Sequence, residues 1–439
     1  MMFSLHYLDR PETENLHATW CKDNINFFSQ SLPSPVNPYL SWLHGIGEKI
    51  FLCSPAEQLD IVNSYYQVLK SSIQHYPLIF EILTRTDFPG FEPVVRAGVL
   101  TDFRLSFQWP NTLEFSEIKK LLGKQSSKTV DLELRSYLAQ LGIQDEIETL
   151  AASQNGKYLS TKIKNIFNPN GSIKILLSVF GVFKTYKDFI DNCKNIFDYS
   201  KFISNYTGWG AYGLVKSIVN TVCPYCNRGF THSIEDNELG KGRPELDHFL
   251  PKSVFPFFAV SLYNLIPVCH TCNHAKSDTS VLEGRAGVFM FSHLHPNIMG
   301  DDVSDSVVFK TVSEGDITNF LLNNTATLND KLTLTKECLD NNRLAESLKT
   351  YKLARTSNEQ EYLIGYYSNH YKEVERILNM VKRYPVKAIE SIAALVGDED
   401  SASLQKKFME VLVIDRPGDE PLGKLKNDLI AGIADSWKA

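Results

Sequence analysis

The hydrophobic pattern of the N-terminal half is clearest from residue 54 onward. Ser54 and Glu57 have the spacing of a capping box, and Pro55 stands at the first helical position. The apolar residues that follow recur every three or four positions, at Ile61, Val62, Tyr65, Val68 and Leu69. This period places them on one face, so the sequence predicts an amphipathic helix that begins at residue 55.

The same reasoning divides the rest of the chain into helical flanks and a mixed centre. Periodic apolar positions predict helices over 115–122, 130–141, 343–353 and 360–381, and a short last helix after residue 419. Short apolar runs predict strands at 265–268, 289–291 and 307–309, whereas Pro and Gly predict loops with short strands over 86–112. The polar stretch 233–244 predicts a flexible loop. We therefore expect an α+β protein with a helical region over 1–205, a central module over 206–300 and a second helical region over 301–439.

Composition excludes some classes of protein. The 439 residues are 43% hydrophobic and 22% charged, which is ordinary for a soluble protein. The net charge of −6 argues against nucleic-acid binding over the whole surface. No apolar run is long enough to cross a membrane, and the first residues lack the pattern of a signal peptide. Four cysteines, Cys21, Cys53, Cys193 and Cys338, are scattered, as expected for buried thiols in the reducing cytoplasm.

One segment is positively charged, although the chain as a whole has a negative net charge. Between residues 151 and 201 there are eight lysines and three aspartates, a net charge of +5. Lysines that neutralise phosphates give sequence-independent affinity for DNA, so a contact with the DNA backbone is one hypothesis. A solvated helical face is the alternative. Because the central module is not basic, lysines outside it would have to provide any such contact with the DNA backbone.

The strongest motif is a pair of Cys-x-x-Cys sequences, Cys223/Cys226 and Cys269/Cys272. Two such knuckles supply four thiolates, the ligand set of a closed tetrahedral Zn²⁺ site. Disulfides or unrelated core thiols are the alternative, although close pairs in a cytosolic chain favour a metal. His270 lies inside the second knuckle and could replace one thiolate. The intervening 227–268 is long enough to hold substructure of its own.

That intervening segment carries residues suited to phosphodiester chemistry. Asp247 and His248 precede an extended run, Asn264 precedes the 265–268 strand, and Asn273 is a good N-cap for a helix beginning at His274. We expect strand, loop, strand and helix, with His248 facing Asn273. A neutral imidazole can take a proton from water. The oxygens of Asp247 and Asn273 are hard ligands for Mg²⁺, and Lys276 could reach a phosphate.

These residues resemble the HNH endonucleases of the ββα-metal fold, in their four-cysteine zinc form. The resemblance covers about residues 220–300. It implies that His248 is the general base, that Asn264 braces the loop and orients the base, and that Asp247 and Asn273 hold a catalytic Mg²⁺ or Mn²⁺. His274 could be the ligand in place of Asn273. Cys223, Cys226, Cys269 and Cys272 would hold structural Zn²⁺.

The function expected from the sequence is therefore metal-dependent hydrolysis of DNA by an HNH endonuclease. The Pro-Lys-Ser after Asp-His and the Asn-Leu-Ile-Pro before the second knuckle are similar to HNH proteins of bacterial anti-phage systems. The helical flanks are expected to control substrate access or to recruit a partner, such as a regulatory or sensor protein. An RNA-cleaving toxin and a non-catalytic, zinc-stabilised nucleic-acid-binding module are the alternatives. The sequence leaves open the oligomeric state, the sequence preference and the number of strands cut.

Overall fold

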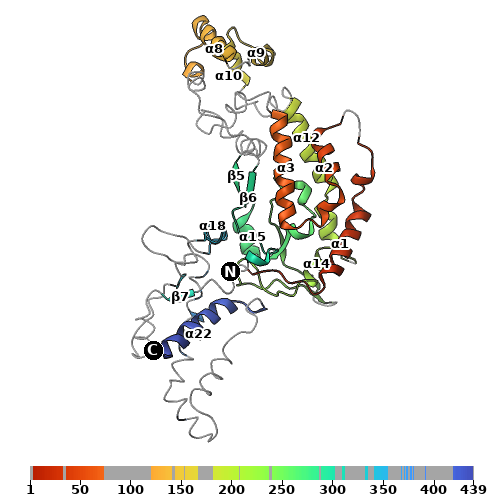
Figure 1. Cartoon of the computed structure of the whole chain (residues 1–439), viewed down its shortest axis with the longest axis vertical. Coiled ribbons are helices and arrows are strands. Elements are labelled where there is room, and N and C mark those ends of the chain that lie inside the picture. The colour runs from red at the N-terminus through yellow and green to blue at the C-terminus, as the bar shows by residue number, and fades with distance from the viewer. Residues whose placement is uncertain are drawn as a thin grey trace.

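The computed structural model shows a mainly helical N-terminal region against a small α+β centre (Figure 1). It describes the following residues: 3–32, 36–73, 120–140, 144–152, 154–166, 181–206, 208–236, 240–285, 288–301, 309–311, 332–334, 341–353 and 419–438, with single positions between 367 and 391. The predicted loops over 86–112 lie outside these residues, as does most of the helix predicted over 360–381. No helix in the described part is both long enough and apolar enough to cross a membrane.

The helix predicted from the capping box is present as α3, Pro55–Ile73. The Ser54 backbone N–H donates to Glu57 Oε2 at 2.7 Å, and the Glu57 N–H donates to Ser54 Oγ at 3.4 Å. Both halves of the capping box are therefore formed, which satisfies two N–H groups that a helix start otherwise leaves unpaired. Its predicted apolar face is buried at Ile61 and Leu69.

Helix α3 lies beside two other helices, α2 (Pro38–Ile46) and α12 (Gly181–Ile196), in Figure 1. Aromatic rings fill the space between them: the Trp42 ring lies 5.5 Å from that of Tyr65 and 6.3 Å from that of Phe189. The first helix, α1 (Arg10–Asn24), begins at an Asp9 cap. Two short helices, α13 (Tyr199–Ser204) and α14 (Ala211–Lys216), lead into the centre.

Three further helices form a small group of their own at the top of Figure 1: α8 (Lys128–Gln140), α9 (Gln144–Ala152) and α10 (Leu159–Ile166). Asp131 on α8 accepts the backbone N–H groups of Leu159 and Ser160, which caps the start of α10. Helix α8 confirms the helix predicted over 130–141.

The centre is a strand, loop, strand and helix in the predicted order. Strand β3 (Glu245–His248) pairs antiparallel with β4 (Leu265–Val268), and helix α15 (His270–Lys276) follows. The connecting loop contains two 3₁₀ turns, Pro256–Phe258 and Leu262–Asn264. A second hairpin, β5 (Leu282–Arg285) and β6 (Val288–Phe291), confirms the strand predicted at 289–291.

The stretch predicted to be a flexible loop at 233–244 is in part a hairpin. Strands β1 (Ile234–Asp236) and β2 (Gly240–Gly242) pair antiparallel, and all six residues are exposed. The prediction was wrong here because backbone hydrogen bonds alone hold the two strands together. A polar, fully exposed hairpin has no alternation of apolar and polar residues from which its strands could be predicted.

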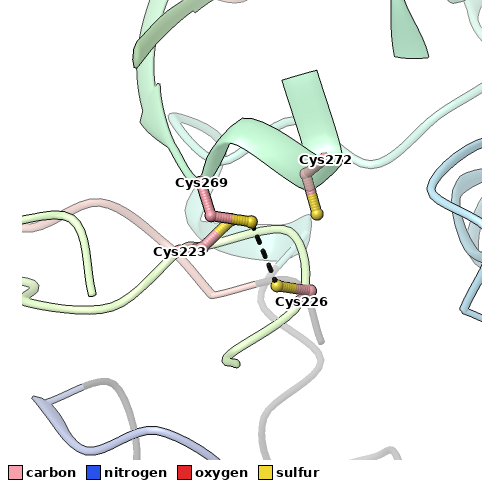
Figure 2. Close-up of side chains that lie close together, drawn as sticks. All are labelled: Cys223, Cys226, Cys269 and Cys272. Carbon is pink, nitrogen blue, oxygen red and sulfur yellow. Dashed lines mark hydrogen bonds between the residues drawn. The ribbon is translucent and has the colours of Figure 1, made fainter. Parts of the chain in front are cut away.

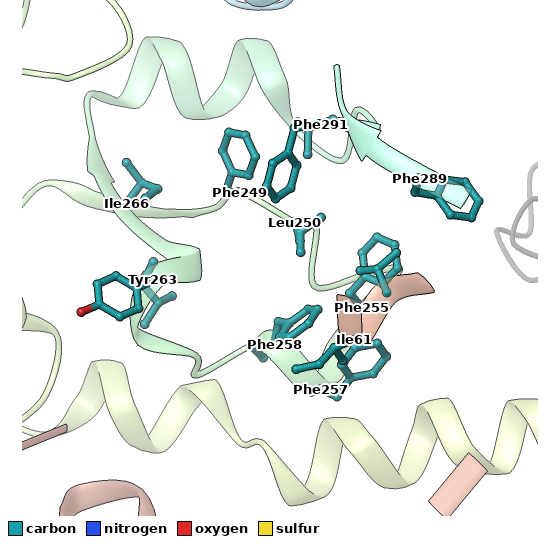
Figure 3. Packing of buried hydrophobic residues seen from close by; sticks show 14 of the residues in the cluster. Ile61, Phe249, Leu250, Phe255, Phe257, Phe258, Tyr263, Ile266, Phe289 and Phe291 are labelled. Atoms are coloured by element: carbon teal, nitrogen blue, oxygen red, sulfur yellow. The ribbon is translucent and has the colours of Figure 1, made fainter. Parts of the chain in front are cut away.

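The loop between β3 and β4 is held by an aromatic core. Phe255, Phe257 and Phe258 are all at most 3% exposed, so their rings pack in the core and are not presented to a ligand. Figure 3 shows these rings together with Phe249, Phe289 and Phe291 and with Ile61 of α3. The N-terminal helices therefore pack directly against the loop that carries the candidate site.

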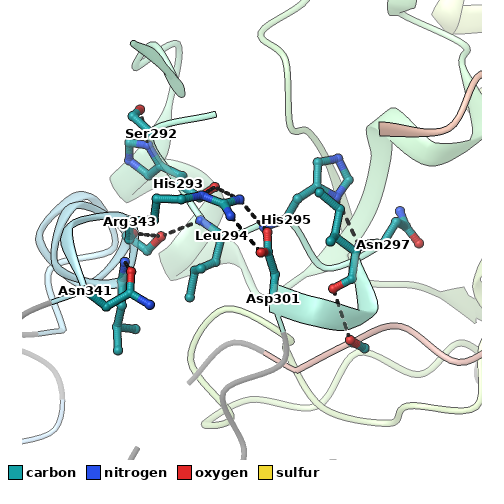
Figure 4. A network of polar contacts seen from close by, with 12 residues as sticks. Ser292, His293, Leu294, His295, Asn297, Asp301, Asn341 and Arg343 are labelled. Carbon is teal, nitrogen blue, oxygen red and sulfur yellow. Dashed lines mark hydrogen bonds and ion pairs between the residues drawn. The ribbon is translucent and has the colours of Figure 1, made fainter. Parts of the chain in front are cut away.

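The C-terminal flank is tied to the centre by a polar network (Figure 4). Helix α18 (Asn342–Thr350), predicted over 343–353, carries Arg343, which donates to Asp301 Oδ1 at 2.8 Å and to the His293 carbonyl at 2.8 Å. His293 Nε2 lies 2.8 Å from Thr350 Oγ1. His293 and His295 are both buried.

The remaining described elements of this flank are β7 (Phe309–Thr311), β8 (Leu332–Leu334) and α22 (Gly423–Lys438). Strands β7 and β8 pair antiparallel, and the Phe309 N–H donates to Asp428 of α22 at 2.9 Å. The last helix spans 16 residues and is longer than the short helix predicted there. The predicted boundaries at 205 and 300 stay predictions.

Candidate functional site

The four paired cysteines come together at one point, as predicted. Their Sγ atoms all lie within 4.8 Å of one another, and Cys226 Sγ is 3.7 Å from Cys269 Sγ (Figure 2). Zn–S bonds of about 2.3 Å in a tetrahedron place two sulfurs about 3.8 Å apart. Burial raises the pKa of the Cys223 thiol well above its usual range, whereas hydrogen bonds from the neighbouring thiols lower the pKa of Cys269. The cluster can hold a structural metal such as zinc.

Local backbone geometry builds each knuckle. In the first, the Asn227 N–H donates to the Cys223 carbonyl at 2.8 Å, and Asn227 adopts φ of 52°. Gly229 completes the turn, and a Cβ there would lie 3.2 Å from the Cys269 Cβ, a contact tighter than side chains normally make. The knuckle therefore needs a residue that tolerates a left-handed backbone at 227 and a small residue at 229.

The second knuckle is the first turn of α15. The predicted helix began at His274 with Asn273 as its N-cap, but the helix begins at His270 with Cys269 as N-cap. The Cys272 and Asn273 N–H groups both donate to the Cys269 carbonyl at 3.1 Å. The prediction was wrong because the Cys-x-x-Cys turn is itself helical, and Asn273 therefore lies in the middle of the helix.

Strand β3 divides the candidate residues between its two faces, because successive side chains on a strand point in opposite directions. Glu245 and Asp247 contact α15, where they reach Asn273 and Lys276 respectively. His248 contacts the loop on the other side. The strand thus brings Asp247 and His248 to the border between helix and loop.

His248 is held in one tautomer. Its Nε2 lies 2.9 Å from the Ala259 carbonyl, and since a carbonyl only accepts, Nε2 carries the proton. Burial lowers the pKa of His248 to about 3, so the ring is neutral and Nδ1 keeps its lone pair. The Tyr199 ring meets it edge-on at 4.6 Å. No group among the described residues hydrogen-bonds to Nδ1.

A second buried histidine, His17, provides a comparison for the hydrogen bonding of the His248 ring. His17 Nε2 lies 2.8 Å from the Val260 carbonyl, next along the chain from the carbonyl that holds His248. His17 Nδ1 accepts from the Trp209 indole N–H at 3.2 Å. Both nitrogens of His17 are therefore used, whereas His248 keeps one nitrogen for another partner.

Asn264 holds the loop that positions the Ala259 carbonyl. Its Oδ1 accepts the Leu250 N–H at 2.7 Å, and its Nδ2 donates to the carbonyls of Leu250 and Phe258, each at 3.1 Å. The side chain is fully buried. Asn264 therefore links Leu250, two positions after His248, to Phe258, which directly precedes Ala259.

Lys276 is not placed where a phosphate contact would require it. The side chain is fully buried, and its ammonium donates to Asp247 Oδ1 at 3.0 Å and to the His248 carbonyl at 2.7 Å. Asp247 Oδ2 also accepts from the Tyr225 hydroxyl at 2.7 Å. Lys276 therefore holds Asp247 and the end of β3, and it does not extend into solvent as a phosphate ligand would.

Lys276→Met is expected to destabilise the protein by about 3–5 kcal/mol, because it leaves the buried Asp247 carboxylate without its cation. Urea unfolding measures the change. Lys194→Met is the matched control, since Lys194 pairs with Asp191 at an exposed position and should contribute about 1 kcal/mol or less. Equal losses in the two variants would contradict a structural role for the Lys276 ammonium.

Glu245 was not predicted to take part in the site, yet it sets the orientation of Asn273. Its Oε2 lies 2.6 Å from Asn273 Nδ2. A carboxylate only accepts, so the amide nitrogen must face Glu245 and the carbonyl Oδ1 must face away. Burial acts to raise the pKa of Glu245, but hydrogen bonds from His270 and Asn273 outweigh it and lower the pKa. Strand alternation from Asp247 was the signal that could have found Glu245.

The candidate residues line one open hollow of about 460 Å³. Its walls include Glu245, Asp247, His248, Asn273, Arg243 and Lys252. The Lys252 ammonium lies 4.7 Å from the centre of the Tyr199 ring, and the Arg243 guanidinium lies 5.8 Å from that of Tyr212. These two cations were also not singled out from the sequence, because nothing in their spacing links them to His248.

The lysines of 151–201 do not share one described face. Lys157, Lys162 and Lys164 belong to the segment around α10, whereas Lys194 and Lys201 lie on α12 and α13. Lys184 and Lys187 also belong to α12, and Lys174 lies outside what the structure describes. Lys201 is the closest of these lysines in sequence to Tyr199 and Ile203, which line the hollow.

Comparison with known proteins gave no further information on the site. No family model matches the chain, and neither the curated proteins nor the solved structures contain a significant match.

Proposed function

We propose that this protein is a metal-dependent endonuclease that hydrolyses phosphodiester bonds of DNA with His248 as general base. The single observation that carries the proposal is the free Nδ1 of His248 beside the hollow. A histidine fixed through Nε2 and open at Nδ1 is preorganised to accept a proton from water. The contrast with His17 supports a role beyond structure.

The oxygen donors fit a hard divalent cation. Asp247 and Asn273 line the same hollow, and Asn273 Oδ1 faces away from Glu245. Carboxylate and amide oxygens are the ligands that Mg²⁺ and Mn²⁺ prefer. When bound by Asp247 and Asn273, Mg²⁺ or Mn²⁺ would polarise the scissile phosphate and stabilise the leaving oxygen.

The side chains of the protein then have distinct tasks. Water attacks phosphorus and its proton moves to His248 Nδ1, while the bond from phosphorus to the leaving oxygen breaks and that oxygen takes up a proton from a second water molecule. The Ala259 carbonyl holds the ring during this step. An anionic phosphate in the hollow favours the charged imidazole, so substrate raises the pKa of His248 toward the range a base needs.

Supercoiled plasmid should be cleaved by the full chain with Mg²⁺ or Mn²⁺ and not after chelation with EDTA. Asn273→Ala should raise the metal concentration needed for half-maximal cleavage at least about tenfold, because one of two proposed protein ligands is lost. Thr271→Ala, on the same helix, is the control and should leave that concentration unchanged. Cleavage whose rate does not depend on added metal in any variant would contradict the proposal.

Two cations that line the hollow, the exposed Lys252 and the half-buried Arg243, are better placed to contact a phosphate than the buried Lys276. Lys252→Ala should weaken binding of a DNA duplex and lower the slope of log affinity against log salt by about 1. Fluorescence anisotropy with Ca²⁺ in place of Mg²⁺ measures binding without cleavage. Lys349→Ala on α18 is the control, since Lys349 is 70% exposed and pairs with Glu346 of its own helix. An unchanged slope for Lys252→Ala would remove Lys252 from the binding surface.

RNA is the second candidate substrate, because the proposed chemistry acts on a phosphodiester in either polymer. The same assay with single-stranded and structured RNA decides between them. We also propose that the enzyme acts in the cytoplasm under the control of a partner protein, a proposal supported by the likeness to anti-phage HNH proteins. Activity that appears only with cell extract would support that arrangement, and a fully metal-loaded chain that binds but never cuts would favour the non-catalytic module.

A further inference from the structure

A second group of metal-ligating side chains lies beside the hollow. Glu245, His270 and His274 each offer one ligand atom, and these atoms lie within 4.8 Å of one another. The two histidines are separated by four positions on α15, which places them on the same side of the helix. Their ring centroids are 4.2 Å apart. His270 Nδ1 lies 2.6 Å from Glu245 Oε1.

The spacing suits a metal with modest side-chain movement. Metal–nitrogen and metal–oxygen bonds of about 2.1 Å in a tetrahedron separate two ligand atoms by about 3.4 Å. To reach this spacing, the distance from His270 Nδ1 to Glu245 Oε1 would have to increase by less than 1 Å. The His274 ring would have to move toward the other two ligand atoms. His270 is 71% exposed and Glu245 38% exposed, so rotation of these side chains meets little packing.

We propose that Glu245, His270 and His274 form a separate site for a divalent first-row transition-metal ion, such as Ni²⁺ or Zn²⁺. Two imidazoles and one carboxylate select such ions over Mg²⁺, which prefers oxygen ligands. The site differs from the cysteine cluster, which has soft thiolate ligands and is closed. The remaining coordination positions are open to water because the group is at the surface.

Binding at this site is compatible with the neighbouring contact to Asn273. Glu245 faces His270 through Oε1 and Asn273 through Oε2. An ion held by Oε1 therefore leaves Oε2 on the Asn273 amide. The proposal concerns metal uptake alone and does not depend on nuclease activity.

The test is calorimetric titration of Ni²⁺ into the untagged full chain, with the cysteine cluster loaded with zinc. One Ni²⁺ should bind here in addition to any that occupies the proposed Asp247–Asn273 site, and His270→Ala, His274→Ala and Glu245→Gln should each weaken this binding event at least about tenfold. His6→Ala is the control, since His6 is exposed and lies on a different segment. Zinc content and melting temperature of each variant show that the fold is kept.

Two results would overturn the proposal: a wild-type chain that binds no Ni²⁺, or His270→Ala and His274→Ala variants that bind it as tightly as the wild type. Loss of plasmid cleavage in a variant that still binds Ni²⁺ bears on the proposed nuclease and leaves this site untouched. The two proposals therefore fail separately.

Discussion

Replacing His248 with alanine is expected to lower the rate of metal-dependent DNA cleavage by about 10²- to 10⁴-fold, the range that general-base catalysis contributes. The reason is local: Nδ1 of this ring is the group placed to take the proton, and no described side chain lies ready to replace it. Single-turnover cleavage of a labelled duplex with saturating Mg²⁺ measures the change without interference from product release. DNA affinity, measured with Ca²⁺, should change little.

The matched control is His17→Ala. His17 is also a buried neutral histidine, since burial lowers its pKa to about 4, and it also bonds to a carbonyl of the same loop. The two variants leave comparable cavities, but only one loses a free ring nitrogen at the hollow. If both variants lost activity to the same extent, the loss would reflect loop distortion. If His248→Ala kept its activity, His248 would not be the base.

Removing the metal from the cysteine cluster is expected to unfold the central module. Structural zinc contributes about 10–16 kcal/mol in small zinc-binding peptides, whereas a whole domain is stable by only about 5–15 kcal/mol. Cys223→Ser should therefore lower the melting temperature sharply and broaden or split the transition. Scanning calorimetry with and without a strong chelator provides the measurement.

Cys193→Ala is the control for this experiment. Cys193 is fully buried on α12 and lies outside the cluster, so its loss removes only packing around one sulfur. It should lower stability by about 1–2 kcal/mol and leave the response to chelator unchanged. A chelator that changes neither the zinc content nor the melting temperature of the wild type would contradict a structural metal.

The sequence predicted the parts of the site that depend on short-range patterns. Cys223, Cys226, Cys269 and Cys272 could be grouped from their spacing, and they do lie together. The order of strand, loop, strand and helix followed from apolar runs and turn residues. The capping box at Ser54 and Glu57 was predicted for the same reason, since both of its hydrogen bonds span three residues.

What could not be predicted depends on contacts between distant segments. Lys276 was expected to reach solvent because lysine usually does. It is buried because Asp247, 29 residues earlier, supplies a carboxylate at 3.0 Å. The partner of His248 Nε2 is a backbone carbonyl, and a backbone group leaves no mark on the sequence. Glu245 matters only because α15 folds back over β3.

Segments from both flanks of the central module contact the first knuckle, so three distant parts of the sequence meet there. The Phe3 N–H donates to the Pro224 carbonyl at 3.0 Å, and the Leu422 N–H donates to the Asn227 carbonyl at 2.6 Å. Lys424 N–H donates to Asn227 Oδ1 at 3.1 Å. A chain synthesised as far as Cys272 already contains all four cysteines, but it lacks both of the contacts to Asn227. Truncation near residue 415 should therefore keep the four cysteines and remove these two hydrogen bonds from the turn of the first knuckle.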